Sequence, residues 1–473
     1  MSYQVVWFKR DLRVEDHRPL VEAARRGPVL PLYIVEPEWL GSPDFDPSHW
    51  TFVRASLVEL DRRLREMGQG LVVRYGEAVD VLQKMQIKHL WAHEETGNWT
   101  TYQRDRRVRK WAKETKTPFT EFPANGVVRR LKSRDGWARN WEARMAEAVV
   151  EAPARLEASI GATGIPHFDV GADRRKLAQR GGEREAHETL NSFLSARGVR
   201  YHMEMSSPLT AEEGGSRLSA YLAYGNLSTR QVAQAARRRR ATIDPAEPGT
   251  WKRALGAFDA RLHWRCHFMQ KLEDEPRVEF ENFARAYDGM REPHWNEEWF
   301  AAWKEGRTGY PMVDACMRML EETGWINFRM RAMLVSFASY HLWLHWREPA
   351  LHLARLFVDY EPGIHYSQIQ MQSGTTGINT VRMYSPLKQM EDQDPDGVFV
   401  REWLGDLPNY PNPIVDHKEA ISLARARIGA VRKLSGTRAE ARQVVKQHGS
   451  RKRAPARKKV GTKTKRDDQQ SLF

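Results

Sequence analysis

The first 125 residues alternate between two hydrophobic periodicities, and this alternation limits the folds that the chain can adopt. Short, β-rich apolar runs, namely QVVWF, PVLPLYIV, GLVVRY, HLWAH and PFTEF, are separated by stretches of helical period. At residues 50–64, for example, Val53, Leu57 and Leu60 recur on one helical stripe. Strands that alternate with helices in this way form a parallel sheet with helices on both faces. The sequence therefore predicts an α/β doubly wound parallel-sheet domain at the N-terminus.

A cluster of charges directly follows the first predicted strand. The segment KRDLRVED, at residues 9–16, contains Lys, Arg, Asp and Glu side chains next to the apolar run QVVWF. Ligands of a doubly wound sheet bind beyond the carboxyl ends of the strands, which is where this segment lies. The region contains no GxGxxG or GxxxxGK motif, so it indicates neither an ordinary dinucleotide site nor a P-loop. The residues alone leave the role of this segment open.

The length of the chain implies more than one domain. With 473 residues, it exceeds what a single hydrophobic core usually holds. We place the α/β domain at residues 1–130 and a connector of polar helix and loop at 131–199. Strand signals are scarce after this connector, whereas segments of helical period continue to about residue 430. The sequence predicts an all-α domain at 200–430 and a basic, disordered tail at 431–473.

The basic charge of the chain is concentrated near its end. The net charge is +14, and residues 446–466 hold ten Lys and Arg residues and no acid. Such a run has no apolar periodicity with which to form a core, so we expect a disordered polycation. Contact with DNA or another polyanion is its favoured role, and improved solubility is the alternative.

The cysteine content argues against disulfides and metal clusters. Only Cys266 and Cys316 are present, too few for an iron–sulfur cluster or a four-thiolate zinc site. His263, Cys266 and His267 share a helical face in HWRCH, but zinc would need another ligand nearby, and we predict no metal site. The chain shows neither a signal-peptide pattern nor a membrane-spanning segment. We expect a cytoplasmic protein that does not contact a membrane.

Four segments of the sequence match the motifs of one known family. VVWFKRDLRVEDHRPL lies at the start of the chain, and GGSRLSAYLAYGNLSTRQ, RTGYPMVDACMRMLEETGWINFRMR and DQDPDGVFVREWLGDLP follow in its second half. In order and spacing they resemble the motifs of the photolyases and cryptochromes, blue-light flavoproteins with an α/β domain and a helical FAD domain. The resemblance extends from about residue 3 to residue 425. It implies that the charges of residues 9–16 are architectural and shape the contact between the two domains.

The segment SRLS offers the groups that a diphosphate requires. Ser216, Arg217 and Ser219 supply hydroxyls and a cation at the start of a predicted helix, whose N-terminal dipole favours an anion. The family resemblance implies FAD as the cofactor, and it allows a second antenna chromophore of unknown identity. By the same resemblance, the FAD site also includes Tyr201, Leu218, Arg265, Phe328, Arg331, Asp359, Glu361 and His365, with Asp359 pairing with Arg331.

His365 departs from the family pattern near the expected flavin. It stands where photolyases commonly place an asparagine that faces flavin N5. A histidine there would donate a hydrogen bond to reduced flavin or carry a proton near neutral pH. The alternative is a buried histidine that only packs in the core.

The expected electron-transfer chain is interrupted. Ile369 replaces the innermost tryptophan of the family, whereas Trp346 and Trp295 match its two outer members. Photoreduction along the usual chain is therefore in doubt. Tyr366 or Trp343 would have to provide a detour.

The expected lesion pocket differs from the family pattern as well. Arg261 stands where repair enzymes for cyclobutane dimers carry a glutamate, and Phe328 and Ala332 replace an asparagine and a methionine. A guanidinium donates hydrogen bonds but cannot act as a neutral acid. Trp264 and Trp325 match aromatic pocket residues. The histidine pair of (6-4) repair enzymes is absent at these positions.

Two functions agree with these observations. The first is a light-driven DNA lyase, in which reduced, excited FAD donates an electron to a pyrimidine photoproduct that Trp264 and Trp325 hold by stacking, with Arg261 and His365 as further site residues. The second is a cryptochrome-type photoreceptor, in which light changes the placement of a tail or of an unknown protein partner. The basic charge favours DNA as the partner, whereas the altered pocket favours signalling or a different lesion.

Overall fold

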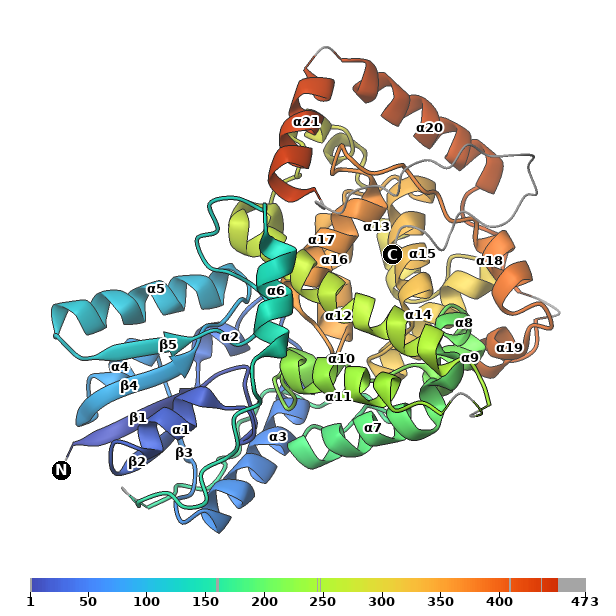
Figure 1. Ribbon diagram of the computed structural model, residues 1–473. Coiled ribbons are helices and arrows are strands. Elements are labelled where there is room, and N and C mark those ends of the chain that lie inside the picture. Colours follow the sequence, from blue (N-terminus) through green and yellow to red (C-terminus); the bar gives the residue numbers. More distant parts are fainter. Residues whose placement is uncertain are drawn as a thin grey trace.

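The computed structural model describes residues 2–158, 161–244, 246, 248–407, 410–434 and 436–449. An α/β domain forms one side of the molecule and a larger helical domain forms the other (Figure 1). Within the described ranges, no helix combines the length and the apolar character that crossing a membrane requires.

Five parallel strands form the N-terminal sheet in the order β3-β2-β1-β4-β5. They are β1 (Tyr3–Phe8), β2 (Val29–Val35), β3 (Val72–Tyr75), β4 (Ile87–His93) and β5 (Phe119–Phe122). The helices around them are α1 (Arg18–Ala24), α2 (Pro37–Leu40), α3 (Pro47–Glu66), α4 (Ala78–Leu82) and α5 (Trp99–Glu114). Val5 and Trp7 of β1 pack in a cluster with α4 and α5, whereas Val6 and Phe8 pack in the opposite cluster with α1 and α3. Both faces are covered, which confirms the predicted fold class.

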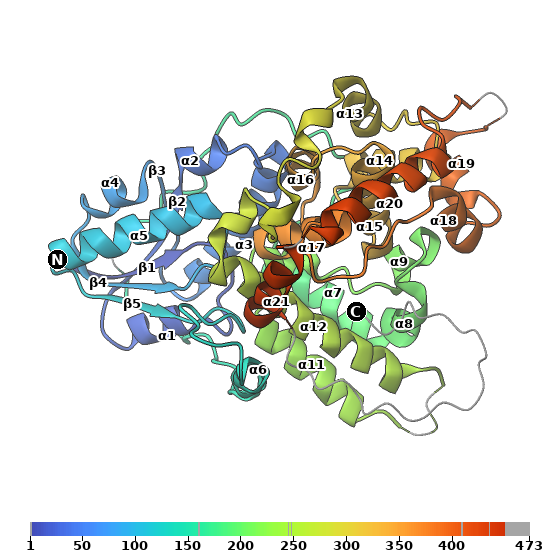
Figure 2. The same ribbon diagram turned by 90° about the horizontal axis from the view of Figure 1, so that it is seen from above.

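The remaining described elements are helical. The α-helices are α6 (Trp137–Ala146), α7 (Glu183–Ser195), α8 (Tyr201–Glu204), α9 (Pro208–Gly214), α10 (Ser219–Ala223), α11 (Thr229–Ala241), α12 (Trp251–Asp274), α13 (Glu297–Lys304), α14 (Pro311–Thr323), α15 (Phe328–Ser336), α16 (Arg347–Leu356), α17 (Pro362–Ser373), α18 (Pro386–Gln393), α19 (Val398–Leu404), α20 (His417–Lys433) and α21 (Thr437–His448). Short 3₁₀ segments are η1 (Arg197–Arg200), η2 (Pro276–Glu279), η3 (Arg285–Tyr287) and η4 (Glu292–His294), and η5 (Phe337–His341) is a π-helical turn. The long helix α12 packs along α17 (Figure 2), and the site described below lies beside this pair.

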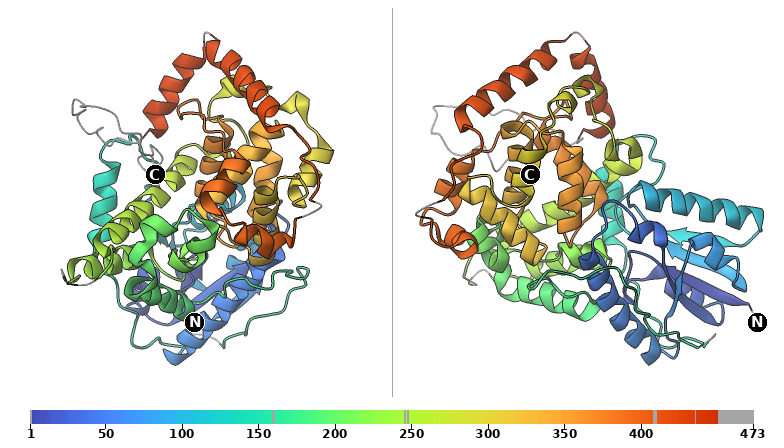
Figure 3. Two further views of the ribbon diagram at one scale, coloured as in Figure 1. Left: turned by 90° about the vertical axis from the view of Figure 1, so that its right-hand side faces the viewer. Right: turned by 180° about the vertical axis from the view of Figure 1, so that it is seen from behind.

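The helical domain extends beyond residue 430, where the sequence predicted a disordered tail. α20 and α21 lie at one edge of the domain (Figure 3). In α21, Val444 and His448 are buried, and the Glu440 carboxylate accepts hydrogen bonds from the first two backbone N–H groups of η3 at 2.5 and 2.9 Å. The prediction was wrong for α21, because these residues give the charged segment a buried face. The polybasic part of the tail after Gly449 lies outside the described residues.

The charged segment at residues 9–16 joins the two domains. Arg10 donates hydrogen bonds to the backbone carbonyls of Ala223 and Tyr360 at 2.8 and 2.7 Å. Arg13 donates to the carbonyl of Gly225 at 2.9 Å. All three carbonyls belong to the helical domain, so these charges have the architectural role that the family resemblance implied.

A buried carboxylate organises the same segment from within. The Asp11 carboxylate accepts hydrogen bonds from the His17 ring at 2.9 Å, the His93 ring at 2.8 Å and the Lys9 backbone N–H at 2.7 Å. The other nitrogen of His17 accepts from the N–H of Leu20 and caps α1. Burial lowers the pKa of His93 to about 3, so this imidazole is a neutral donor. Asp11 thus links the ends of β1 and β4 to the start of α1.

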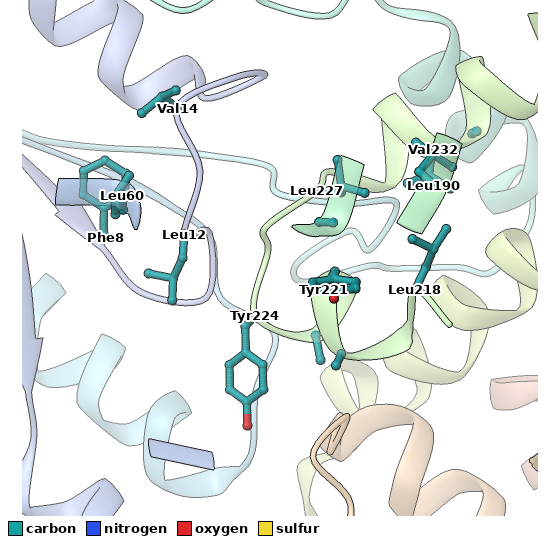
Figure 4. Packing of buried hydrophobic residues seen from close by; sticks show 14 of the residues in the cluster. Phe8, Leu12, Val14, Leu60, Leu190, Leu218, Tyr221, Tyr224, Leu227 and Val232 are labelled. Atoms are coloured by element: carbon teal, nitrogen blue, oxygen red, sulfur yellow. The ribbon is translucent and has the colours of Figure 1, made fainter. Parts of the chain in front are cut away.

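A hydrophobic cluster crosses the domain junction beside these polar contacts. Leu12 and Val14 follow β1, whereas Tyr224, Leu227 and Val232 belong to the helical domain, and all five side chains are buried in one cluster (Figure 4). The two domains therefore share apolar core as well as hydrogen bonds, and their relative position is fixed.

Asp11→Leu is expected to lower the free energy of unfolding by about 3 kcal/mol or more, because three buried donors lose their acceptor and each such loss costs about 1–3 kcal/mol. Urea denaturation followed by circular dichroism measures the effect. The control, Asp80→Leu, alters an exposed acid on α4 and should change the midpoint little. Equal midpoints for the two variants would show that Asp11 is not structural.

Candidate functional site

One cavity of about 500 Å³ collects the residues that the sequence predicted for the cofactor site and for catalysis. Its walls come from α12, α15, α17 and the segment before α10. The predicted residues in these walls are Tyr201, Ser216, Arg217, Leu218, Ser219, Arg261, Trp264, Arg265, Trp325, Phe328, Arg331, Asp359, Glu361 and His365. Trp295 and Trp346, predicted for electron transfer, do not line it.

A bidentate ion pair fixes one wall of the cavity. The Arg331 guanidinium donates to the two oxygens of Asp359 at 3.0 and 2.9 Å and to the carbonyl of Ile326 at 2.7 Å. Its Cζ also lies 4.1 Å from the ring centroid of Phe357. Burial alone would raise the pKa of Asp359, but Arg331, together with Ser219 and the charge of Arg217, outweighs this effect and holds the pKa below its ordinary value. Both side chains are therefore ionised, and Arg331 is also held by the Ile326 carbonyl and the Phe357 ring.

Arg217 presents a cation to the cavity from an unusual backbone conformation. Its φ is +57°, in the left-handed region that a residue with a β-carbon rarely adopts. Nη1 is buried and has no hydrogen-bond partner among the described residues, and the nearest acid, Glu212, lies 3.8 Å from Nη2. The following helix, α10, begins at Ser219 and has only five residues, so the predicted helix-dipole contribution is small. The guanidinium itself is the main anion-binding group here.

The same guanidinium covers an aromatic residue that was expected to stack on a base. The Cζ of Arg217 lies 3.9 Å from the ring centroid of Trp325. One face of this indole is therefore already occupied. Trp264 packs on Phe268 with a centroid distance of 5.7 Å and an interplanar angle of 29°.

Three further polar residues of the wall are only partly satisfied. Arg265 Nη2 donates to Glu361 at 2.8 Å and to the carbonyl of Leu222 at 2.9 Å. Arg265 Nε, Glu361 Oε1 and Gln368 Oε1 are buried, yet none has a hydrogen-bond partner within the described part of the chain. Leaving a buried polar group unpaired costs about 1–3 kcal/mol. A polar ligand in this cavity would remove that cost.

His365 lines the cavity as a neutral side chain. Its Nε2 lies 2.8 Å from the carbonyl of Ala350, so Nε2 carries the hydrogen and donates it. Burial lowers the pKa of His365 to about 4. Burial outweighs the favourable charge of Asp44, so the structure does not favour the proton near neutral pH that the sequence analysis considered. Nδ1 is left as a hydrogen-bond acceptor.

The tryptophans of the expected electron-transfer chain are separated in the structure. Trp346 is fully buried, and its ring contacts are with Tyr366, at a centroid distance of 6.4 Å, and with His345, at 5.4 Å. Trp295 contacts Phe300 at 4.9 Å. Within the described part of the chain, no ring contact joins Trp295 to Trp346.

The sequence analysis missed Lys271, which also lines the cavity. It is buried, and its Nζ lies 4.9 Å from the ring centroid of Phe268. Burial, together with the charge of Arg134, lowers the pKa of Lys271 to about 7. Its position seven residues after Trp264 on α12 places both on one helical face, and this spacing could have identified it.

Three smaller spaces lie near the main cavity, and the smallest, of about 40 Å³, is lined by Arg265 and Glu361. One, of about 430 Å³, shares Arg261 and Phe328 with the main cavity and is lined also by Arg253 and Arg329. Another lies at the carboxyl ends of β1 and β2 and has only about 70 Å³. Charged side chains line this 70 Å³ space. Among them, Arg104 forms ion pairs with Glu36, Glu95 and Asp105 at 2.7, 2.5 and 2.9 Å.

Known proteins resemble this chain over most of its length. Residues 4–158 match a family model described as DNA photolyase, and residues 258–454 match one described as the FAD binding domain of DNA photolyase. The chain is 30% identical over 434 residues to a deoxyribodipyrimidine photo-lyase of Thermus thermophilus, with 89% of this chain and 97% of that protein covered. It is 26% identical over 442 residues to cryptochrome DASH of Gloeobacter violaceus, with 86% of each covered. The crystal structure of an archaeal photolyase from Sulfolobus tokodaii with two FAD molecules superposes with a TM-score of 0.75, at 27% identity, over 90% of this chain and 99% of that one.

Lys271→Met is expected to stabilise the protein at pH 6 and to lose this advantage as the pH rises. The folded-state pKa of about 7 lies below the ordinary value for lysine, so the unfolded chain binds the proton more tightly. The wild-type protein therefore gains stability between about pH 7 and pH 10, and the variant cannot. Urea denaturation at pH 6, 8 and 10 should show the two unfolding free energies converging. Lys84→Met, at an exposed lysine, is the control, and a pH-independent difference for Lys271→Met would contradict the prediction.

Proposed function

The chain belongs to the photolyase/cryptochrome family, and we propose that it is an FAD-dependent, blue-light-driven DNA photolyase that splits a pyrimidine photoproduct by electron transfer from reduced flavin. The observation that supports this most is the single cavity in which the Arg331–Asp359 pair, the unpaired guanidinium nitrogen of Arg217 and the aromatic Trp264 meet. A cryptochrome-type photoreceptor is the second candidate. Arg261 and Phe328 favour it, because they replace groups that recognise a lesion in the family.

The residues of the cavity fit FAD. Arg217, with the hydroxyls of Ser216 and Ser219, would hold the diphosphate, which needs a cation and polar donors. The Arg331–Asp359 pair and Arg265 would face the polar edge of the flavin ring, where the unpaired donors and acceptors lie. FAD supplies the light absorption and the one-electron chemistry when it is bound.

His365 would set which form of the ligand the cavity favours. Its Nε2–H is engaged by the Ala350 carbonyl, so Nδ1 accepts a hydrogen bond from an N–H of the ligand and cannot donate one. A flavin whose N5 carries a hydrogen offers such a donor. His365 would therefore stabilise the reduced, protonated form, in the position where the family places an asparagine.

A basic surface would position the DNA. The 430 Å³ cavity beside the flavin site is lined by Arg253, Arg261 and Arg329, whose guanidinium groups suit phosphate oxygens. α21 ends at His448, which lines the main cavity, and the polybasic segment follows directly in the sequence. We propose that this segment adds phosphate contacts without sequence preference.

Arg331→Ala is expected to reduce bound FAD by about tenfold or more, because Asp359 would remain buried without its cation. Flavin absorbance per protein, after purification and after reconstitution with FAD, measures the loss. The double variant Arg331→Met/Asp359→Leu removes both charges and separates loss of FAD from loss of fold. Arg25→Ala, at an exposed arginine, should retain FAD. Wild-type protein that FAD cannot reconstitute would contradict the proposed cofactor.

Repair is tested with reduced protein, blue light and oligonucleotides that carry either a cyclobutane dimer or a (6-4) product, each in single-stranded and duplex form. We expect light-dependent repair of one lesion. Arg261→Ala should weaken binding of that lesion by about tenfold, the value of one charge-assisted hydrogen bond. Arg261→Glu alone should not create repair of cyclobutane dimers, because Phe328 and Ala332 still alter the pocket.

The matched control for the repair assay is Arg238→Ala on α11, at an exposed arginine outside the cavity. It should leave the preference for damaged DNA unchanged. If neither lesion is bound above undamaged DNA and neither is repaired, the photolyase proposal fails and the photoreceptor takes its place.

A further inference from the structure

Three buried aromatic residues connect the cavity to the interior beside Ile369. Tyr360 lines the cavity, and its ring centroid lies 6.5 Å from that of Tyr366. Tyr366 in turn lies 6.4 Å from Trp346. Tyr366 and Trp346 are fully buried, and Tyr360 is 8% exposed. These rings form a continuous path at the place where Ile369 breaks the series of tryptophans.

The two tyrosine hydroxyls belong to a hydrogen-bond chain in which each hydroxyl donates toward Asp44. The Tyr360 hydroxyl lies 2.7 Å from Asp44 Oδ2 and 3.2 Å from the Tyr366 hydroxyl. An ionised carboxylate only accepts, so Tyr360 donates its single hydrogen to Asp44 and must accept from Tyr366. Arg347 Nη1, which only donates, completes the chain at 3.1 Å from the Tyr366 oxygen. Protons can therefore move from Tyr366 through Tyr360 to Asp44.

Asp44 is suited to receive a proton. It is 4% exposed, and Asn98 also donates a hydrogen bond to Oδ2 at 2.9 Å. Burial would raise the pKa of Asp44, but the hydrogen bonds from Tyr360, Ser42 and Asn98 lower it below its ordinary value. Asp44 is therefore ionised at neutral pH, although it lies in the α/β domain and Tyr360 lies in the helical domain.

We propose that Tyr360 and Tyr366 form a proton-coupled electron relay that replaces the tryptophan missing at Ile369, with Asp44 as the proton acceptor. The inference rests on the proposed function, because its oxidant is FAD in the oxidised state under blue light. Tyr360 loses one electron to the oxidant while its hydroxyl proton passes to Asp44. A hydrogen atom then passes from Tyr366 to Tyr360, which restores the Tyr360 phenol and leaves a neutral radical on Tyr366.

An external thiol closes the cycle. It supplies one electron to Tyr366 through Trp346 and is itself oxidised. The proton held by Asp44 returns to Tyr360, whose own proton returns to Tyr366, so Asp44, Tyr360 and Tyr366 regain their starting state. The thiol releases its proton to solvent and ends as a thiyl radical, and the flavin keeps the electron. Burial raises the pKa of both Tyr360 and Tyr366, so neither phenol ionises beforehand and each oxidation needs this acceptor.

Trp343, the other detour considered from the sequence, lacks these features. Its ring centroid lies 4.7 Å from the guanidinium carbon of Arg291 and 4.9 Å from that of Arg427. Its indole N–H donates to the carbonyl of Met290 at 3.3 Å, and a carbonyl is a poor proton acceptor. A radical cation between two guanidinium groups is unfavourable, whereas the relay through Tyr366 produces a neutral radical.

The relay is tested with Tyr360→Phe, Tyr366→Phe and Asp44→Asn, which keep the size of each side chain. Tyr287→Phe is the matched control, because Tyr287 is buried and its hydroxyl has no partner among the described residues. All four variants and the wild type are first assayed for bound FAD and melting temperature. The rate at which blue light bleaches oxidised flavin is then measured without oxygen and with a thiol, in H₂O and in D₂O. Illuminated frozen samples are examined by electron paramagnetic resonance.

We expect every variant to retain FAD and the three relay variants to bleach more slowly by about 10²-fold, the usual contribution of a positioned proton acceptor. The wild type should be slower in D₂O and should show a neutral tyrosyl radical that Tyr360→Phe removes. Tyr287→Phe should behave as the wild type.

Three outcomes overturn the relay, and they differ in what else they exclude. Wild-type protein that cannot bind FAD refutes the proposed function, and the relay then has no oxidant. FAD-loaded wild type that does not bleach, or Tyr→Phe variants that bleach at the wild-type rate, refutes the relay alone and leaves the proposed cofactor in place. A tryptophan radical in place of the tyrosyl radical assigns the path to another donor.

Discussion

The hydrogen bonds from Arg10 and Arg13 to carbonyls of the helical domain are the contacts on which the site depends. They come from the turn after β1, which the buried Asp11 holds in place. Arg10 binds the carbonyl of Tyr360, and the Tyr360 hydroxyl binds Asp44 in the α/β domain. The backbone that carries Asp359 and Glu361 is thus held from the neighbouring domain. A domain junction fixed in this way keeps charged groups of the cavity in position before any ligand enters, which is the preorganisation that binding and electron transfer require.

The N-terminal fold was predictable because each of its strands, and the helix α3, corresponds to a pattern of apolar residues in the sequence. Each strand of the sheet coincides with one of the apolar runs, and α3 coincides with the stripe of Leu57 and Leu60. The end of the helical domain was not predictable in the same way. The helix α21 presents few apolar residues, and Glu440 and His448 stabilise it by polar contacts with residues more than a hundred positions away. Local composition does not record such contacts, so a charged helix resembled a solvated tail.

For the candidate site, too, some features were predictable from the sequence and others were not. Motif matching predicted which side chains line the cavity, because the identities at positions such as Arg331 and Asp359 are visible in the sequence. It did not predict their protonation or pairing. The neutral state of His365 depends on its burial, its tautomer depends on the Ala350 carbonyl, and the face of Trp325 is covered by Arg217 from another segment. Lys271 remained unnoticed because a lysine on a long helix is usually exposed, whereas this one is enclosed by tertiary packing.

The residues proposed for photoreduction and those proposed for lesion recognition come from different parts of the chain. The short segment 359–369 holds Asp359, His365 and both tyrosines of the proposed relay, and Ile369 lies at its end. The lesion-facing changes, at Arg261 and Phe328, lie on α12 and α15 instead. Ile369, where the family carries a tryptophan, and Arg261, where repair enzymes carry a glutamate, both line the cavity, but they lie on the different helices α17 and α12. A photoreceptor needs the first set to remain functional, whereas a repair enzyme whose flavin is already reduced needs the second. Intact relay residues beside a remodelled pocket therefore agree with either function as long as light can reduce the flavin, and lesion binding is the measurement that separates the two.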